Sequence, residues 1–181
     1  MKTLLIILAA TLISPEGHTI FDFNSAKTSG QWFIVNDGVM GGVSQSKINL
    51  NGDGTATFSG TLSPDNNGGF ASIRTKITGE LDNDFKGVSI RLKGDGNIYS
   101  LRFRSDSRFD GYSYQAKVQT EKDKWVEFSV PFKEFTPTYR GYTLQGKPEL
   151  VAGNIEQMGI MLSDKQWGEF TVDIDWIKFY K

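Results

Sequence analysis

From residue 20 to the end of the chain, short apolar runs alternate with turn residues, and this pattern constrains the fold more than any other feature. The runs recur about every 8–12 residues, and no amphipathic helix of more than a few turns interrupts them. Such spacing is typical of a sandwich or barrel of antiparallel strands. The sequence therefore predicts an all-β protein, and one domain is the simplest organisation because repeats, low-complexity tracts and linkers are absent from it.

Two glycine-rich turns predict hairpins between the runs on either side of them. They are Asn51–Gly54, which reads Asn-Gly-Asp-Gly, and Gly94–Gly96, which reads Gly-Asp-Gly. Successive side chains of a strand point to opposite faces of its sheet. In the second hairpin this alternation predicts that Arg91, Arg102 and Arg104 share one face, opposite the apolar side chains.

The last two segments of interest are a loop and a long final strand. Residues 132–142 are predicted to form a loop that Pro137 stiffens. The final run, 169–180, changes parity, because Phe170, Val172 and Ile174 alternate on one face while Ile177 and Phe179 fall on the other. A β-bulge near residues 175–176 would return both sets to the core.

Composition excludes several classes of function. The 181 residues suffice for one full hydrophobic core, and the net charge of −1 gives nucleic-acid phosphates and anionic membranes no electrostatic attraction. Without cysteine there are no disulfides, thiol nucleophiles or thiolate metal sites. The single histidine, His18, precedes the predicted domain, which argues against a Ser-His-Asp triad or a multi-histidine metal centre. We therefore expect no catalytic residue, no cofactor, no metal and no nucleic-acid partner.

Asp173 and Asp175 form the best candidate for a catalytic carboxylate pair. A glycosidase needs two carboxylates on opposite sides of a sugar, roughly 5–10 Å apart. Neighbours on one strand seldom supply that geometry, and they more often accept hydrogen bonds from the backbone or from arginine. Loop aspartates such as Asp53 and Asp65 lack the ordered spacing of an EF-hand, so a calcium site is unsupported.

The N-terminal residues resemble a secretory signal peptide. Met1–Lys2 precedes an apolar run over Thr3–Ile13 that is too short for a membrane span, which takes roughly 20 residues. The alternative is an N-terminal strand or helix packed on the domain. We expect a leader over residues 1–19 and the β-sandwich domain over 20–181. We also expect an exported location, periplasmic or secreted, in preference to a cytoplasmic one, and no transmembrane span.

Two glycine-rich segments form the first candidate site. Trp32–Ser44 contains Asn-Asp-Gly and then Gly-Gly, which supply the positive φ values of a tight reversal, and Asn67–Arg74 begins Asn-Gly-Gly-Phe. We expect these segments to meet and to form a rim that contacts a ligand or partner, although the glycines are equally compatible with a purely architectural role. The candidate contact residues are Asn36, Asp37, Met40, Asn67 and Arg74.

The predicted arginine face is the second candidate site. Guanidinium groups are planar donors for carboxylates, so Arg91, Arg102 and Arg104 would suit an acidic ligand, a glycan or an acidic protein patch. The alternative is the ordinary solvated side of an antiparallel sheet. Side chains expected at the surface, where they would anchor an interface or stack on a sugar, are Tyr139, Arg140 and Trp167.

The block W-F-I-V-N-D-G-V-M-G-G-V-S at Trp32–Ser44, followed by N-G-G-F-A-S-I-R at Asn67–Arg74, resembles the complex I intermediate-associated protein family. The resemblance covers nearly everything after residue 20. It implies a two-sheet antiparallel β-sandwich of the jelly-roll type, similar to galactose-binding and carbohydrate-binding domains. It also implies a role without catalysis, since mitochondrial members of the family act as assembly chaperones for NADH:ubiquinone oxidoreductase, or complex I.

These observations favour a non-enzymatic binding domain that acts as an assembly chaperone or protein-binding scaffold. Its expected partner is a protein, such as a respiratory complex subunit or an assembly intermediate. The alternative is an exported carbohydrate-binding module, which the jelly-roll strand pattern, the leader and the surface of aromatic and arginine side chains favour. A hydrolase has only Asp173 and Asp175 in its support.

Overall fold

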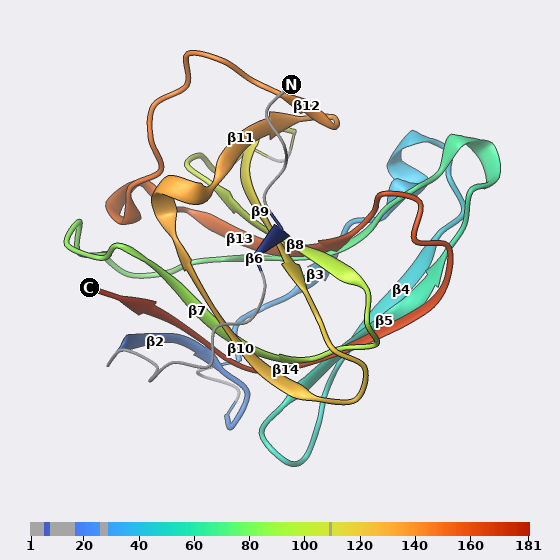
Figure 1. Ribbon diagram of the computed structural model, residues 1–181, viewed down its shortest axis with the longest axis horizontal. Helices are drawn as coiled ribbons and strands as arrows, with labels where there is room; N and C mark the ends of the chain where they lie inside the picture. Colours follow the sequence, from blue (N-terminus) through green and yellow to red (C-terminus); the bar gives the residue numbers. More distant parts are fainter. Residues whose placement is uncertain (1–5, 8–16, 26–28, 109) are drawn as a thin grey trace.

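The computed structural model describes residues 6–7, 17–25, 29–108 and 110–181. Its strands form two sheets that pack face to face as a β-sandwich (Figure 1). Apart from the parallel pairing of β1 with β9, the strand pairs within these ranges are antiparallel, which confirms the predicted fold class.

Within the described residues, the larger sheet has eight strands in the order β12-β11-β9-β8-β13-β6-β3, with β1 paired to β9. Its strands are β1 (Ile6–Ile7), β3 (Phe33–Ile34), β6 (Ala71–Lys76), β8 (Ile98–Arg104), β9 (Ser113–Gln119), β11 (Thr136–Tyr139), β12 (Tyr142–Thr143) and β13 (Gln157–Leu162).

The smaller sheet has six strands within the described residues, in the order β10-β7-β14-β5-β4, with β2 paired to β14. Its strands are β2 (Gly17–Asp22), β4 (Gln45–Leu50), β5 (Ala56–Leu62), β7 (Gly87–Lys93), β10 (Trp125–Pro131) and β14 (Gly168–Tyr180). Four 3-10 turns complete the described elements: η1 (Asp37–Met40), η2 (Asp65–Asn67), η3 (Phe132–Glu134) and η4 (Ala152–Asn154).

The core lies between the sheets and follows from strand alternation. Ile90 of β7 and Leu101 of β8 are fully buried, as are their neighbours two residues away on each strand. The register of β14 against β7 shifts between Ile174 and Trp176, which confirms the predicted bulge. The bulge keeps Ile177 buried although its parity differs from that of Ile174.

The hairpin predicted across Asn51–Gly54 is confirmed by the pairing of β4 with β5, whereas the hairpin predicted across Gly94–Gly96 is wrong. In the structure β7 belongs to the smaller sheet and β8 to the larger one, so the chain crosses between sheets at this turn. Alternation specifies which side of a strand is apolar, but it does not specify the partner strand. Strands β7 and β8 pack their apolar sides into the same core from opposite sheets. This arrangement produces the same alternation of apolar and polar residues as a hairpin would.

Two further expectations are corrected. The segment predicted as a loop over 132–142 contains η3 and strand β11, which pairs with β9. His18 belongs to the folded domain, because β2 begins at Gly17 and pairs His18 with Phe179. Its ring lies 5.9 Å from that of Phe85. Most of the predicted leader lies outside the described residues, and among those described no helix is long and apolar enough to cross a membrane.

Candidate functional site

Three arginines meet on the outer face of the larger sheet, and we call Arg74, Arg102 and Arg104 the arginine cluster. The register explains their meeting, because Gly159 of β13 pairs with Arg74 of β6 on one side and with Arg102 of β8 on the other. Because Gly159 has no side chain, a hollow lies between Arg74 and Arg102. The hollow is lined by Ser72, Ile73, Gln157, Met158, Ile160 and Met161 in addition to the cluster and Gly159.

Arg102 is partly buried and is held by neighbouring side chains of the larger sheet. Its Nε donates to Ser113 Oγ at 2.8 Å, its Nη2 donates to the same oxygen, and its Nη1 lies 2.9 Å from Met161 Sδ. In the part of the chain that the structure describes, Arg102 makes no ion pair with a carboxylate. Burial, and then the charges of Arg104 and Arg74, lower the pKa of Arg102 to about 10.

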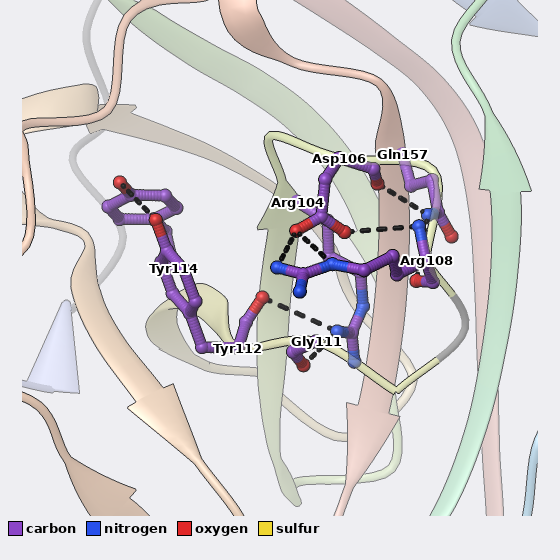
Figure 2. A network of polar contacts seen from close by, with 7 residues as sticks. All are labelled: Arg104, Asp106, Arg108, Gly111, Tyr112, Tyr114 and Gln157. Carbon is purple, nitrogen blue, oxygen red and sulfur yellow. Dashed lines mark hydrogen bonds and ion pairs between the residues drawn. The ribbon is translucent and has the colours of Figure 1, made fainter.

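Arg104 is 7% exposed and is held by neutral acceptors, as Figure 2 shows. Its Nη1 donates to the carbonyl oxygens of Gly111 and, at 3.3 Å, Tyr112. Gln157 fixes the loop that carries these carbonyls, since its Nε2 donates to Asp106 O at 2.7 Å. Burial lowers the pKa of Arg104, against the opposing effect of Asp106 and Asp110 nearby. Burial followed by the charge of Arg104 lowers the pKa of Arg74 to about 10 as well.

The two carboxylates beside the cluster already bind other arginines. Asp106 Oδ2 accepts a hydrogen bond from Arg108 Nη2 at 2.7 Å (Figure 2). Asp110 Oδ2 lies 3.1 Å from Arg140 Nη2 and 3.4 Å from the Tyr139 hydroxyl. The predicted residues Tyr139 and Arg140 are therefore placed together around Asp110, and neither aspartate forms a direct ion pair with Arg102 or Arg104.

Arg91 does not share a face with Arg102 and Arg104, which corrects the sequence prediction. It lies on the outer side of the smaller sheet, where its Nη1 binds Asp175 Oδ2. Beside it, Lys93 Nζ lies 2.8 Å from Asp173 Oδ2. Trp125 stacks below both cations, 5.0 Å from the Arg91 guanidinium and 5.4 Å from the Lys93 ammonium. We call these five residues the paired face, because each cation has a carboxylate partner within the chain.

The two glycine-rich segments are in contact, and Asp37 joins them. Asp37 is 2% exposed, and its carboxylate accepts hydrogen bonds from Ser44 Oγ at 2.6 Å, Ser44 N at 3.0 Å, Gly69 N at 2.7 Å and Phe70 N at 3.4 Å. Burial raises the pKa of Asp37, but these hydrogen bonds outweigh burial and hold it below its ordinary value. Asp37 therefore directs both carboxylate oxygens into the chain.

Asn36 acts in the same junction, and glycine is required around it. Asn36 Oδ1 accepts from Ser46 Oγ at 2.8 Å and from Ser72 N at 3.3 Å. A Cβ at Gly42 would lie 2.4 Å from Asp37 Cγ, and one at Gly68 would lie 2.7 Å from Asp37 Oδ2. The side chain of Asn67 lies outside what the structure describes.

Large apolar side chains are exposed beside this junction, and we call Val39, Met40, Val43 and Trp167 the apolar cap. Their exposed fractions lie between 42% and 66%. Neighbouring loops carry them, because Asp37 binds the backbone of Gly69 and a Cβ at Gly69 would lie 3.5 Å from the Trp167 ring. The structure thus places the predicted residues Met40 and Trp167 at one end of the sandwich.

Several residues of these sites escaped the sequence prediction. Ser113 accepts from Arg102, Gly159 and Gln157 line the hollow, and Val39 and Val43 extend the apolar cap. Val39 and Val43 could have been predicted from the sequence, because apolar residues inside a glycine-rich turn are expected to be exposed. The other three depend on the pairing of β13 between β6 and β8, which the sequence does not reveal.

Comparison with known proteins gives a family and a fold. The profile of the family described as complex I intermediate-associated protein 30 (CIA30) matches residues 21–174. The complex I intermediate-associated protein 30 of Mus musculus is 25% identical over 92% of this chain and 57% of its own length. A Schizosaccharomyces pombe protein is 32% identical over 80% of this chain and 75% of its own length. This chain therefore spans little more than half of the mouse protein.

Among solved structures, a family 11 carbohydrate-binding module of Clostridium thermocellum superposes with a TM-score of 0.65. The match covers 93% of this chain and 96% of the module, at 18% sequence identity. At that identity the likeness shows the jelly-roll fold alone.

Proposed function

Because the chain belongs to the complex I intermediate-associated protein 30 family, we propose that it is a non-enzymatic domain that binds a protein partner during assembly of a respiratory complex. The relatives that carry the family name are described as associated with complex I intermediates. The proposed partner is accordingly a subunit or an assembly intermediate of complex I.

The apolar cap is the observation that carries this proposal. Val39, Met40 and Trp167 are exposed apolar side chains on neighbouring loops, and exposed apolar side chains that lie close together characterise protein interaction sites. Tryptophan and methionine are also enriched at the centres of interfaces. Asp37 fixes the backbone beneath these side chains, so little ordering is required when a partner covers them.

The test is affinity capture from the organism that makes the protein, with Met40→Ser and Trp167→Ser combined in one variant. We expect the wild-type chain to recover respiratory complex subunits and the double variant to lose most of them. Tyr142→Ser is the matched control, because Tyr142 is an exposed aromatic residue on the opposite edge strand of the larger sheet. Failure to enrich any respiratory subunit, together with normal complex I levels in a deletion strain, would reject the proposal.

We also propose that the chain is exported. The supporting observation is the charged residue and apolar run of residues 1–13, which match a secretory signal. An exported chain meets only those subunits that are accessible outside the cytoplasm, so its location restricts the partner. N-terminal sequencing of the protein from each cell fraction tests this, and an uncleaved chain found in the cytoplasm would contradict it.

A carbohydrate-binding module remains the alternative function, and the exposed ring of Trp167 favours it. One structure of the family 11 module contains a β-1,3-1,4-mixed-linked tetrasaccharide, so mixed-linked β-glucan is the first ligand to test. Calorimetry with this glucan, together with a glycan array, would compare the wild type with Trp167→Ala. Binding that Trp167→Ala abolishes supports the alternative, and uniform absence of binding rejects it.

A further inference from the structure

Positive charge accumulates around the arginine cluster in a chain whose net charge is only −1. The cluster and its rim contain five arginines (Arg74, Arg102, Arg104, Arg108 and Arg140). Arg108 pairs with Asp106 and Arg140 pairs with Asp110, so the positive charges of Arg102 and Arg104 are in surplus among the described residues. A surplus of this kind attracts anions and raises their local concentration.

The donors of the cluster are also held in place before any ligand arrives. Arg102 uses three of its five N–H groups on Ser113 and Met161, which fixes the plane of its guanidinium. Arg104 is fixed by two backbone carbonyls. A fixed planar fork loses little conformational freedom when it binds a carboxylate with two parallel hydrogen bonds.

Burial increases the effect of an incoming negative charge. A buried cation without a counter-ion is costly, and Arg102 and Arg104 have neutral hydrogen-bond partners within the described ranges. An anion in the hollow would offset that cost where electrostatic attraction is stronger than in water. The chemistry therefore favours an oxyanion over a neutral ligand.

The residues that line the hollow favour a protein ligand over a polysaccharide. Sugar-binding faces usually offer an aromatic ring for stacking, and none of the residues that line this hollow is aromatic. Instead the hollow is a shallow depression over Gly159, so a carboxylate would bind at its mouth, against the guanidinium groups that border it.

We propose that the arginine cluster binds carboxylates of an acidic segment in a protein partner. The site is distinct from the apolar cap, and the inference rests on the proposed function only in taking its ligand from a protein. Arg102 and Arg74 bind the carboxylate directly on the two sides of Gly159. Arg104 adds positive charge at the buried end of the hollow.

The experiment measures binding of a fluorescent peptide of six glutamates to the purified chain by anisotropy. The matched probe is the same peptide with glutamine throughout, and polygalacturonate and inorganic phosphate are added as competitors. We expect the glutamate peptide to bind, the glutamine peptide not to bind, and affinity to fall as salt is raised. Polygalacturonate or phosphate that binds while the glutamate peptide does not would overturn the proposal.

Variants of both faces locate the site. Arg102→Gln is expected to weaken binding of the glutamate peptide by about tenfold or more, because it removes a fixed charged donor. Arg74→Gln is the second variant, since it is less central in the packing and keeps the test valid if Arg102→Gln unfolds. Arg91→Gln is the control and should change the affinity by less than about twofold, because Arg91 is on the paired face.

The outcomes separate this inference from the proposed function. Wild-type affinity in both folded variants, Arg102→Gln and Arg74→Gln, would overturn the assignment of the site. Peptide binding through the cluster without capture of respiratory subunits would reject the proposed function and leave the site standing. Capture of those subunits without peptide binding would support the proposed function and reject the arginine cluster as a carboxylate site.

Discussion

The outer faces of the two sheets both carry arginine, but the groups that bind its guanidinium differ. On the paired face, Arg91 and Lys93 bind Asp175 and Asp173, and the Arg91 side chain keeps 36% of its surface exposed. On the larger sheet, Arg102 and Arg104 are more deeply buried and bind hydroxyl, thioether and carbonyl groups. The charges of the paired face are matched within the chain, whereas Arg102 and Arg104 make no ion pair with a carboxylate among the described residues.

This difference teaches that an arginine on a strand is informative about binding only after its partners within the chain are known, and our proposal applies this to the arginine cluster. Solvated ion pairs contribute little to stability and are the usual state of a polar sheet face. Buried arginines that lack carboxylate partners are unusual, because desolvation penalises them. The two faces therefore respond differently to substitution, and the following predictions measure that difference.

The largest effect on stability is expected from Asp37→Asn, because Asp37 holds the backbone that precedes one strand of the arginine cluster. Asp37 binds the backbone of Gly69 and Phe70, directly before β6, the strand that carries Arg74. Asparagine keeps one acceptor oxygen but turns an NH2 group toward buried donors that the second carboxylate oxygen accepted from, and this should reduce the free energy of unfolding by about 2–4 kcal/mol. Urea unfolding measures this change. Asp84→Asn, at an exposed carboxylate, is the control and should stay close to the wild type.

The pH dependence of the same variant has a definite sign. The folded-state pKa of Asp37 is lowered, so its contribution to stability is complete above its ordinary value of 3.8 and is lost as pH falls through the lowered pKa. The stability difference between wild type and Asp37→Asn should therefore shrink below about pH 4. A difference that grows on acidification would contradict the hydrogen-bonded, ionised state of Asp37.

The next effect compares one arginine from each face. Arg104→Leu leaves the carbonyl oxygens of Gly111 and Tyr112 without their donor and should destabilise the fold by about 1–3 kcal/mol. Arg91→Leu removes a partly solvated ion pair and should cost less than about 1 kcal/mol. Thermal and urea unfolding of the two variants test the order. Equal losses of stability in the two variants would mean that burial does not make Arg104 more important for the fold than Arg91.

A further substitution is designed to give the arginine cluster a carboxylate partner within the chain, as the paired face has. Met161 Sδ lies 2.9 Å from Arg102 Nη1, so Met161→Glu places a carboxylate beside the Arg102 guanidinium. We expect the affinity for the glutamate peptide to fall about tenfold, equivalent to about 1.4 kcal/mol, because the new carboxylate competes with the ligand. Met161→Gln has a similar shape without the charge and should bind nearly as well as the wild type.

The sequence predicts the layers of this fold better than the neighbours within each layer. Alternation identified the buried sides of β7 and β8 and the bulge in β14, since these depend on local periodicity. It failed to separate Arg91 from Arg102, because both strands have one apolar side and only their pairing differs. Long-range pairing depends on which strands compete for each edge, and local pattern does not encode that competition.

The candidate sites show the same division. Contact between the glycine-rich segments was predictable, because the glycines of both segments permit a close approach of their backbones and this requirement is local. The arginine cluster was visible only in part, since Arg74 was assigned to a loop rim and Arg102 to a strand face. Their meeting requires β13, which follows β8 by more than fifty residues, to lie between β6 and β8 with Gly159 in register.

The smallest effect is expected at the second ion pair of the paired face. Asp173 accepts from Thr57 Oγ1 at 2.6 Å and binds Lys93 across the register of β14 and β7. Asp173→Asn keeps an acceptor for the hydroxyl but removes the charge, so the loss of stability should be less than about 1 kcal/mol. Because the pair is partly solvated, the loss should shrink further in 1 M salt, where the screening length is about 3 Å. Urea unfolding of wild type and Asp173→Asn at low and high salt measures this. A loss above 2 kcal/mol that salt leaves unchanged would show that the paired face depends on its charges as strongly as the arginine cluster does.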